Sequence, residues 1–151
     1  MTPIKKHIQV GDKISIENPV FLAPMEGITD LPFRLICKEY GADMVYTEFV
    51  ASEALIRDVP KSFRKIKLSD KERPVGIQIF GNSPERMAES AKIAQEEGAD
   101  LVDINYGCWV KKVVNNNCGS GLMRFPELMA DITAACVNAV TIPVTIKTRL
   151  G

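Results

Sequence analysis

The sequence has very little histidine and tryptophan and no net charge. His7 and Trp109 are the single examples of their types among 151 residues, and 19 basic side chains balance 19 acidic ones. One histidine near the amino terminus is more often a surface residue than a ligand, and the four cysteines match no common zinc spacing. We therefore expect no metal site. Zero net charge is weak evidence against nucleic-acid binding, because a local basic patch is sufficient for it.

Long apolar runs are also missing. No stretch approaches the length of a membrane span, and the opening residues MTPIKKHIQVGD lack the apolar core of a signal peptide. The cysteines are therefore expected as free thiols in a reducing compartment. We expect a cytoplasmic protein without a membrane span. The length fits one ordinary domain with the composition of a globular protein.

Short β-branched runs alternate with helical patterns along the chain. These runs are too short for buried helices and predict strands. The predicted strands are Val20–Ala23, Met44–Phe49, Val75–Phe80, Leu101–Asn105 and Val144–Arg149. The segment Ile8–Ile16 predicts a small hairpin around Gly11 and Asp12.

Capping residues delimit the predicted helices. Ser83 and Pro84 suit a helix start and Gly98 its end, Asp30 and Gly41 delimit a second helix, and Pro126 opens a third. The stretch from 51 to 69 predicts a short helix followed by a basic loop. Buried faces are expected at Met87, Ala91 and Ala94, and at Leu128, Ile132, Ala135, Cys136 and Ala139.

Repeated strand–helix units indicate an α/β fold with a parallel sheet. A doubly wound sheet would usually carry a glycine-rich phosphate turn after its first strand, and "APMEGITD" contains none. A TIM (β/α)8 barrel fits better. About five strands are present where a barrel needs eight, so the chain is expected to be a fragment, the first half or more of a longer barrel.

Polar side chains alternate with apolar ones along three predicted strands. Val75, Ile77, Ile79, Val102, Ile104, Val144 and Ile146 form apolar faces suited to outer helices, while the opposite faces carry Gly76, Gln78, Phe80, Leu101, Asp103, Asn105, Thr145, Lys147 and Arg149. Buried amides and ammonium groups require partners. Gln78, Asn105 and Lys147 on separate strands suggest a shared polar ligand. The alternative is an internal network of Lys147 with Asp103 or Glu48.

Cys108 follows the end of a predicted strand, in the stretch "DINYGCWVKK". Barrel enzymes place catalytic groups in such loops. A thiol there can act as a nucleophile, a ligand or a proton donor. Cys37 and Cys136 fit apolar helix faces and are expected to be buried. Cys118 is expected to be structural, and the Gly-Ser-Gly that follows it is only a weak phosphate-loop signal.

The chain resembles the bacterial tRNA-dihydrouridine synthases, particularly the B-type and its nitrogen-regulation-like relatives. The resemblance rests on seven segments in family order: "APMEGITDLPFR", "YGADMVYTE", "RPVGIQIFG", "GADLVDINYGC", "VKKVV", "GSGLM" and "IPVTIKTRLG". Together they cover nearly the whole chain from about residue 20 onward.

The resemblance implies an enzyme with flavin mononucleotide (FMN) on a TIM barrel. It implies that Cys108 is the catalytic acid and that Asn105 helps to hold the target uracil. It also implies that Pro24, Met25, Glu26, Gln78 and Lys147 contact the flavin. By the same resemblance, NADPH or NADH reduces the flavin, a hydride passes from flavin N5 to uracil C6, and Cys108 protonates C5.

The implied substrate is tRNA, held through its phosphates by basic groups. Candidates are Lys111 and Lys112, with Arg57, Lys61, Arg64 and Lys65 as further ones. Trp109 and Glu26 depart from the proline and the alanine usual in the family, and Cys118 also replaces an alanine.

The resemblance also implies parts that this chain lacks. Residues 1–151 correspond to the N-terminal portion of the catalytic domain, without the later strands and the helical tRNA-binding domain. We expect the fragment to bind flavin poorly and the full-length protein to be a monomer. The alternatives are a flavin barrel reducing free pyrimidines, a non-catalytic RNA-binding relative, and a phosphate-binding lyase without flavin.

Overall fold

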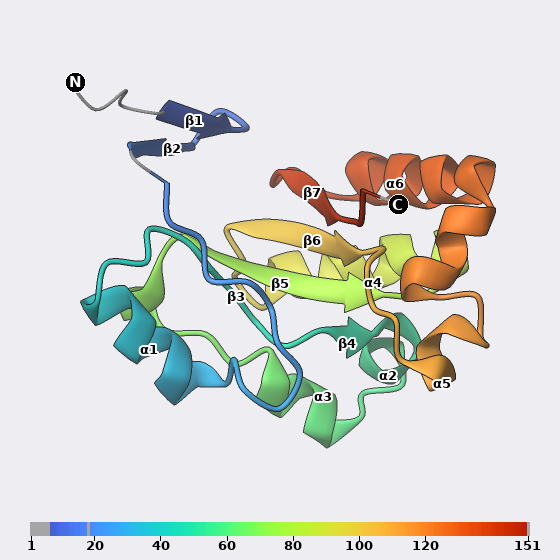
Figure 1. Cartoon of the computed structure of the whole chain (residues 1–151), viewed down its shortest axis with the longest axis horizontal. Coiled ribbons are helices and arrows are strands. Elements are labelled where there is room, and N and C mark those ends of the chain that lie inside the picture. Colours follow the sequence, from blue (N-terminus) through green and yellow to red (C-terminus); the bar gives the residue numbers. More distant parts are fainter. Residues whose placement is uncertain (1–6, 18, 151) are drawn as a thin grey trace.

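A parallel sheet forms the centre of the molecule. The computed structural model describes residues 7–17 and 19–150. The strands of the sheet are β3 (Val45–Tyr46), β4 (Val50–Ala51), β5 (Val75–Phe80), β6 (Leu101–Asn105) and β7 (Val144–Lys147). They lie side by side in chain order, with β3 and β4 both paired to β5 (Figure 1). This order shows no reversal of the kind that marks a doubly wound sheet. The predicted α/β chain with a parallel sheet is confirmed.

Helices connect the strands, and four of the six α-helices lie at predicted places. They are α1 (Leu31–Glu39), α2 (Ser52–Ile56), α3 (Pro60–Lys65), α4 (Pro84–Glu96), α5 (Lys111–Val114) and α6 (Pro126–Ala139), with 3-10 turns η1 (Asp70–Glu72) and η2 (Gly119–Arg124). Asp30 caps α1 by accepting a hydrogen bond from the N–H of Phe33, and Ser83 caps α4. Gly41 and Gly98 follow these helices with φ of +95° and +89°, as expected for helix ends.

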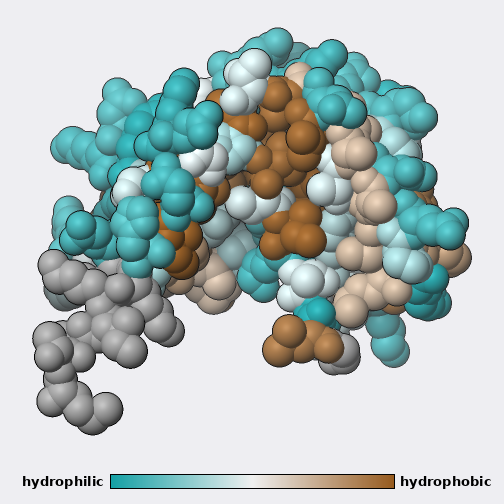
Figure 2. Space-filling view, turned by 90° about the horizontal axis from the view of Figure 1, so that it is seen from above, coloured by the Kyte–Doolittle hydropathy of each residue, from teal (hydrophilic) through white to brown (hydrophobic). Residues whose placement is uncertain are grey.

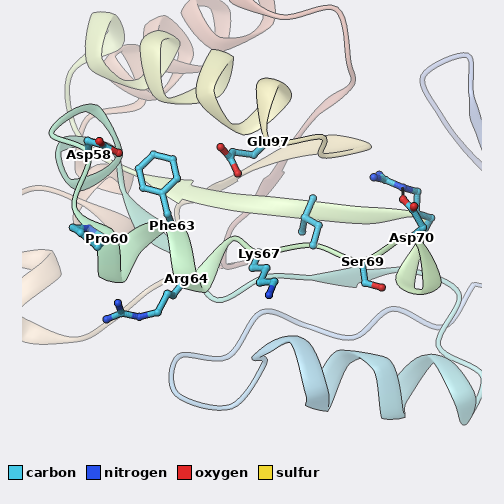
Figure 3. Close-up of a pocket in the computed structure, with 10 residues that line it drawn as sticks. Asp58, Pro60, Phe63, Arg64, Lys67, Ser69, Asp70 and Glu97 are labelled. Carbon is cyan, nitrogen blue, oxygen red and sulfur yellow. Dashed lines mark hydrogen bonds and ion pairs between the residues drawn. The ribbon is translucent and has the colours of Figure 1, made fainter.

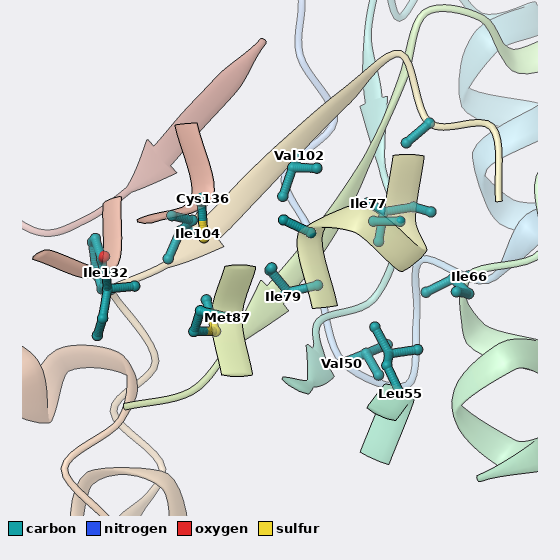
Figure 4. Packing of buried hydrophobic residues seen from close by; sticks show 14 of the residues in the cluster. Val50, Leu55, Ile66, Ile77, Ile79, Met87, Val102, Ile104, Ile132 and Cys136 are labelled. Carbon is teal, nitrogen blue, oxygen red and sulfur yellow. The ribbon is translucent and has the colours of Figure 1, made fainter. Parts of the chain in front are cut away.

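The main core lies between the sheet and the helices α2, α4 and α6. Ile77 and Ile79 of β5, with Val102 and Ile104 of β6, are fully buried against Met87 of α4 (Figure 4). Each such aliphatic side chain contributes about 1.5–3 kcal/mol through burial. Ile132 and Cys136 of α6 complete the same cluster. The predicted apolar faces of β5 and β6 are therefore confirmed, whereas Ile146 of β7 is largely exposed. The polar strand faces point away from these helices.

A hairpin covers the amino ends of the strands. Strands β1 (His7–Val10) and β2 (Ile14–Glu17) pair around Gly11, as predicted. Ile14 and Ile16 pack against Met44 and Leu101. In Figure 1 this hairpin lies at the side of the sheet opposite α5. The carboxyl ends of the strands are consequently the ones left for loops that carry functional side chains.

The predicted strand Met44–Phe49 is wrong as a single strand. Tyr46 pairs with Gly76 and Val50 pairs with Ile79, so four steps on one strand match three on its partner. One extra residue between paired positions makes a β-bulge. The hydroxyl of Thr47 accepts a hydrogen bond from the N–H of Gln78, replacing a ladder carbonyl. The bulge separates β3 from β4.

Two further predictions need correction. Val20–Ala23 is not a strand, because it makes only one parallel bridge, between Phe21 and Met44, before Pro24. The predicted basic loop after α2 contains the helix α3, which begins at Pro60, a residue suited to the first helical turn. The short helix α5 was not anticipated.

One side of the molecule exposes apolar surface. Val137 on α6 and Ile146 on β7 are 51% and 48% exposed and line a groove with Tyr106 and Met129. The view from above shows apolar side chains exposed in the middle of this face (Figure 2). This surface adjoins the last strand of the sheet, which has a partner on one side only among the described residues.

Candidate active site

Polar side chains from three strands meet near the carboxyl end of the sheet. Gln78, Asp103 and Thr145 are register partners across β5, β6 and β7, and Asn105 is paired with Lys147 one row further along. Register partners in a parallel sheet point to the same face. The predicted grouping of these residues on one face is therefore confirmed.

Hydrogen bonds link these side chains into one continuous network. Asp103 Oδ1 accepts from the hydroxyl of Thr145 at 2.6 Å, and its Oδ2 accepts from Gln78 Nε2 at 2.5 Å. Gln78 Oε1 then accepts from Asn105 Nδ2 at 2.9 Å. Asn105 Oδ1 accepts from the backbone N–H of Cys108 at 2.9 Å and of Gly107 at 3.2 Å. This hydrogen-bond network thus runs from a buried carboxylate to the cysteine loop.

The carboxylate of Asp103 determines which group donates and which accepts in each hydrogen bond of this network. An ionised carboxylate only accepts hydrogen bonds, so Gln78 must turn its amide nitrogen toward Asp103. Its oxygen then faces Asn105, which must offer its own nitrogen. The oxygen of Asn105 is left for the two backbone N–H groups. Asp103 therefore orients both amides. The sequence placed Asp103 on the correct face of its strand but did not predict this role.

Burial changes the pKa values of titratable side chains in this cluster. Desolvation raises the pKa of Asp103, while hydrogen bonds from Thr145 and Gln78 and the charge of Lys147 oppose the rise. The pKa of Tyr46 is raised to about 12 by burial and by the negative charge of Asp103. No hydrogen bond or salt bridge joins the ammonium group of Lys147 to Asp103 or Glu48 among the described residues, so the alternative network is not found there. Glu48 instead contacts Gly27 and Lys65.

The loop of Cys108 follows β6 without helix or strand structure. Its cysteine is half-buried, while the next residue, Trp109, is 72% exposed. The guanidinium of Arg149 donates to the carbonyl of Gly107 at 2.7 Å. Ser120 donates to the carbonyl of Cys108 from both its N–H and its hydroxyl. The backbone around the thiol is consequently held from several directions.

The other cysteines differ from Cys108. Cys136 and Cys118 are buried, and burial raises the pKa of the Cys136 thiol to about 12 and also raises that of Cys118. The expected burial of Cys37 is only partial, since this thiol is half-buried on α1. All four cysteines are free. Cys108 is the one placed at a strand end.

The residues predicted to contact the flavin that follow the first apolar run lie in a tight turn. The hydroxyl of Thr29 accepts from the N–H of Met25 and donates to its carbonyl. Gly27 has φ of +73° and donates its N–H to Glu48. Pro24 and Met25 are half-buried at this turn. The turn is thereby tied to the bulged strand segment beside it.

Two predicted cofactor residues already have protein partners. Glu26 forms a salt bridge with Lys65, which was predicted to contact RNA. Gln78 is fully buried, with its amide oxygen and nitrogen both engaged. Lys147, in contrast, is exposed and forms no hydrogen bond through its ammonium group within residues 7–17 and 19–150. The roles of these three residues toward a cofactor remain predictions.

Exposed basic side chains surround the carboxyl end of the sheet. Lys111 and Lys112 begin α5 directly after the cysteine loop. Lys61 and Arg64 line a pocket of about 350 Å³ with Glu26 and Glu48. Arg57, directly after α2, forms a salt bridge with Glu53 of that helix. The predicted RNA-contacting residues therefore lie near one edge, and two of them are in ion pairs.

A separate cavity involves none of the residues of the polar cluster or the cysteine loop. A cavity of about 800 Å³ is lined by Phe63 and Arg64 of α3 and by Glu97 after α4 (Figure 3). Its walls mix both signs of charge, and Arg73 there is paired with Asp70 and Asp100. Among the described residues, no cluster of three His, Cys, Asp or Glu side chains is arranged to hold a metal ion. Over the same residues, every helix is too short or too polar to cross a membrane.

Comparison with known proteins places this chain in a family. The family model described as "Dihydrouridine synthase (Dus)" matches residues 21–151. A "Probable tRNA-dihydrouridine synthase" of Rhizobium leguminosarum is 47% identical over 138 residues, which cover 91% of this chain and 43% of the relative.

Two proteins named "tRNA-dihydrouridine synthase B" are similarly close. That of Xanthomonas axonopodis is 44% identical over 95% of this chain and 43% of its own length, and that of Vibrio cholerae is 41% identical over 90% and 42%. The chain therefore spans less than half the length of these relatives. The resemblance read from the sequence motifs is confirmed, and the chain belongs to the dihydrouridine synthase family.

Proposed function

We propose that the full-length protein containing this chain reduces uridines in tRNA to 5,6-dihydrouridine, with FMN as cofactor and NADPH or NADH as reductant. The observation that carries the proposal is the Cys108 loop at the end of β6, held by the side chain of Asn105. In a chain that belongs to the dihydrouridine synthase family, this arrangement would supply a positioned proton donor beside a group able to bind a uracil.

We further propose that the parallel sheet is the first part of a (β/α)8 barrel. Strands in chain order, helices packed on one face and polar residues on the other support this fold. The exposed groove of α6 and β7 offers an apolar surface for a following unit. Residues 1–151 would form the N-terminal portion of the catalytic domain, followed by further strands and a helical tRNA-binding domain.

The residues on this face are compatible with a flavin. Lys147 presents a free ammonium group next to Asn105, which suits the polar edge of an isoalloxazine ring. Pro24, Met25 and Glu26 would line the cofactor, and Gln78 would contribute its remaining N–H. FMN held by these residues would supply, in its reduced form, a hydride for the uracil.

The remaining chemistry belongs to the protein. Asn105 Nδ2 has two N–H groups and donates one to Gln78, so one is left for a uracil carbonyl. The thiol of Cys108 gives its proton to C5, and the thiolate then regains a proton from solvent. Uridine, NADPH and a proton thus become dihydrouridine and NADP⁺. A positioned acid contributes about 10²–10⁴-fold to such a step.

The exposed surface near the cysteine suits RNA. Lys111 and Lys112 would contact phosphates, and Lys61 and Arg64 extend the basic surface. The target base must leave its stack to reach Cys108, as in other base-modifying enzymes. Four free thiols support a reducing cytoplasm as the location, and we expect a monomer.

Nucleoside mass spectrometry tests the proposal. The full-length protein is incubated with unmodified tRNA, FMN and NADPH, and dihydrouridine is quantified for wild type, Cys108→Ala and Cys37→Ala. Cys37 is a matched control because it is also a half-buried free cysteine. We expect product from wild type and Cys37→Ala, and a fall of about 10²-fold or more for Cys108→Ala.

Other outcomes would favour the alternative functions. Reduction of free uracil but not of tRNA would indicate a free-pyrimidine reductase. Binding of tRNA without bound flavin or product would indicate a non-catalytic RNA-binding relative. Equal activity of Cys108→Ala and wild type would remove Cys108 from the mechanism.

A further inference from the structure

The Gly-Ser-Gly turn at 119–121 packs against the cysteine loop. The backbone N–H of Ser120 donates to the carbonyl of Cys108 at 2.9 Å. The hydroxyl of the same serine donates to the same oxygen, also at 2.9 Å. One residue, twelve positions along the chain, therefore holds the carbonyl of Cys108 twice.

The two glycines permit this close approach. Gly119 has φ of +56°, and a Cβ there would lie 2.7 Å from the carbonyl oxygen and 3.0 Å from the Cβ of Cys108. A Cβ on Gly121 would lie 2.8 Å from the carbonyl oxygen of Val114, at the end of α5. Side chains at these positions would push the turn away from the loop. The two glycines of the motif are thus explained by close packing, of Gly119 against Cys108 and of Gly121 against Val114.

Every backbone polar group of Gly107 and Cys108 has a partner. Asn105 accepts from both N–H groups, Arg149 donates to the carbonyl of Gly107, and Ser120 donates to the carbonyl of Cys108. The loop has no helical or strand hydrogen bonds of its own. These contacts therefore determine where the cysteine backbone lies.

We propose that Ser120 is a positioning residue that orients the Cys108 thiol by fixing its carbonyl. The catalytic part of this inference rests on the proposed function, whereas the effect on the loop does not. Loss of the hydroxyl removes one of two hydrogen bonds to the carbonyl and leaves the loop able to shift. A shift of about 1 Å in a reacting group can cost up to about 10²-fold in rate.

Steady-state kinetics of the full-length holoenzyme test the catalytic part. We expect Ser120→Ala to lower kcat about tenfold while KM for tRNA stays within about twofold, because the substrate contacts are unchanged. Ser120→Thr keeps a hydroxyl and should recover most of the loss. Ser90→Ala is the matched control, since the Ser90 hydroxyl is buried in α4 without a hydrogen-bond partner.

Alkylation of cysteines with iodoacetamide tests the loop independently of activity. Peptide mass spectrometry follows Cys108, half-buried Cys37 and buried Cys136 in the same full-length samples. Ser120→Ala should raise the alkylation rate of Cys108 by roughly threefold or more through local opening, and leave Cys37 and Cys136 unchanged. Ser120→Thr should behave as wild type.

The outcomes separate the two proposals. Unchanged kcat and unchanged Cys108 alkylation in Ser120→Ala would overturn the positioning role, as would an equal rise at all three cysteines, which indicates general unfolding. A fall in kcat that Ser120→Thr does not restore would also contradict it. An inactive wild type would count against the proposed function, while selective alkylation of Cys108 in Ser120→Ala would still support the loop assignment.

Discussion

Asn105 and Cys108 are joined by a 2.9 Å hydrogen bond from the backbone N–H of the cysteine to the side-chain oxygen of the asparagine. The opposite end of the same amide donates to Gln78. One side chain therefore couples the cysteine loop to the buried network of the sheet. Changes in that network are expected to reach the thiol through Asn105.

Replacement of Asn105 by alanine should destabilise the protein. The variant would leave Gln78 Oε1 fully buried without its partner, which costs about 1–3 kcal/mol. The urea midpoint of the full-length protein measures this loss. Lys92→Ala, at an exposed position of α4, is the control and should change little. Equal midpoints for wild type and Asn105→Ala would contradict the network.

Asp103 should make stability depend on pH. Desolvation by burial raises its folded-state pKa above the unfolded value of about 3.9, so protonation is easier in the folded than in the unfolded state. The contribution to stability is present below the unfolded pKa and is lost as pH rises through the raised folded pKa. The variant Asp103→Asn lacks this loss. Its neutral amide can offer an oxygen to Gln78 and a nitrogen to the hydroxyl of Thr145.

The measurement is urea unfolding of wild type and Asp103→Asn at a series of pH values. The stability of the variant relative to wild type should increase as pH rises across that window and level off above it. Asp131→Asn, an exposed aspartate on α6, is the control. A relative stability that falls with rising pH would mean that the folded pKa is depressed rather than raised.

Arg34 and Glu72 should show strong coupling. Both side chains are fully buried, and two guanidinium nitrogens bond the two carboxylate oxygens at 2.7 and 3.1 Å. Arg34→Met would leave a buried carboxylate unpaired, at a cost of about 3–5 kcal/mol. Adding Glu72→Met should recover much of this loss.

A double-mutant cycle in urea measures this coupling. Arg34 also donates to the carbonyls of Thr29 and Lys67, so the double variant is not expected to reach wild-type stability. Additive losses in the cycle would show that the two side chains act independently. Arg57 and Glu53, an exposed pair on α2 and its end, provide a control cycle with coupling of about 0.5 kcal/mol or less.

Trp109 should report tRNA binding. It is the single tryptophan of this chain and is 72% exposed beside Lys111 and Lys112. Stacking of a base on an exposed indole changes its fluorescence. We expect a change in emission on titration with tRNA in the full-length protein, assigned to this residue by its loss in Trp109→Phe.

The two lysines should set the salt dependence of that binding. Lys111→Ala with Lys112→Ala should reduce the slope of log K against log salt by about 1–2, because each phosphate contact contributes about 0.9. Lys92→Ala, at an exposed position of α4, should leave the slope unchanged. An unchanged slope in the double variant would exclude these lysines from the RNA surface.

Much of the fold could be predicted from local patterns. Strands β5 and β6 have the predicted bounds, and α1, α4 and α6 begin at the predicted caps. Such signals depend on residues close together in the chain. The bulge after Tyr46 could not be predicted, because it depends on the register with β5, which lies about thirty residues further along. The single bridge at Phe21 likewise depends on a distant partner, Met44.

The sequence by itself determined which face of each strand is polar and that Cys108 follows a strand end, because side chains alternate along a strand. Its motifs also determined the family. The tertiary structure decided how those residues are connected. Asp103, Gln78 and Asn105 are up to 27 residues apart, and only strand register brings their polar atoms within hydrogen-bond distance. The contact of Ser120 with Cys108 has the same origin, since two glycines permit a close approach that no local pattern encodes.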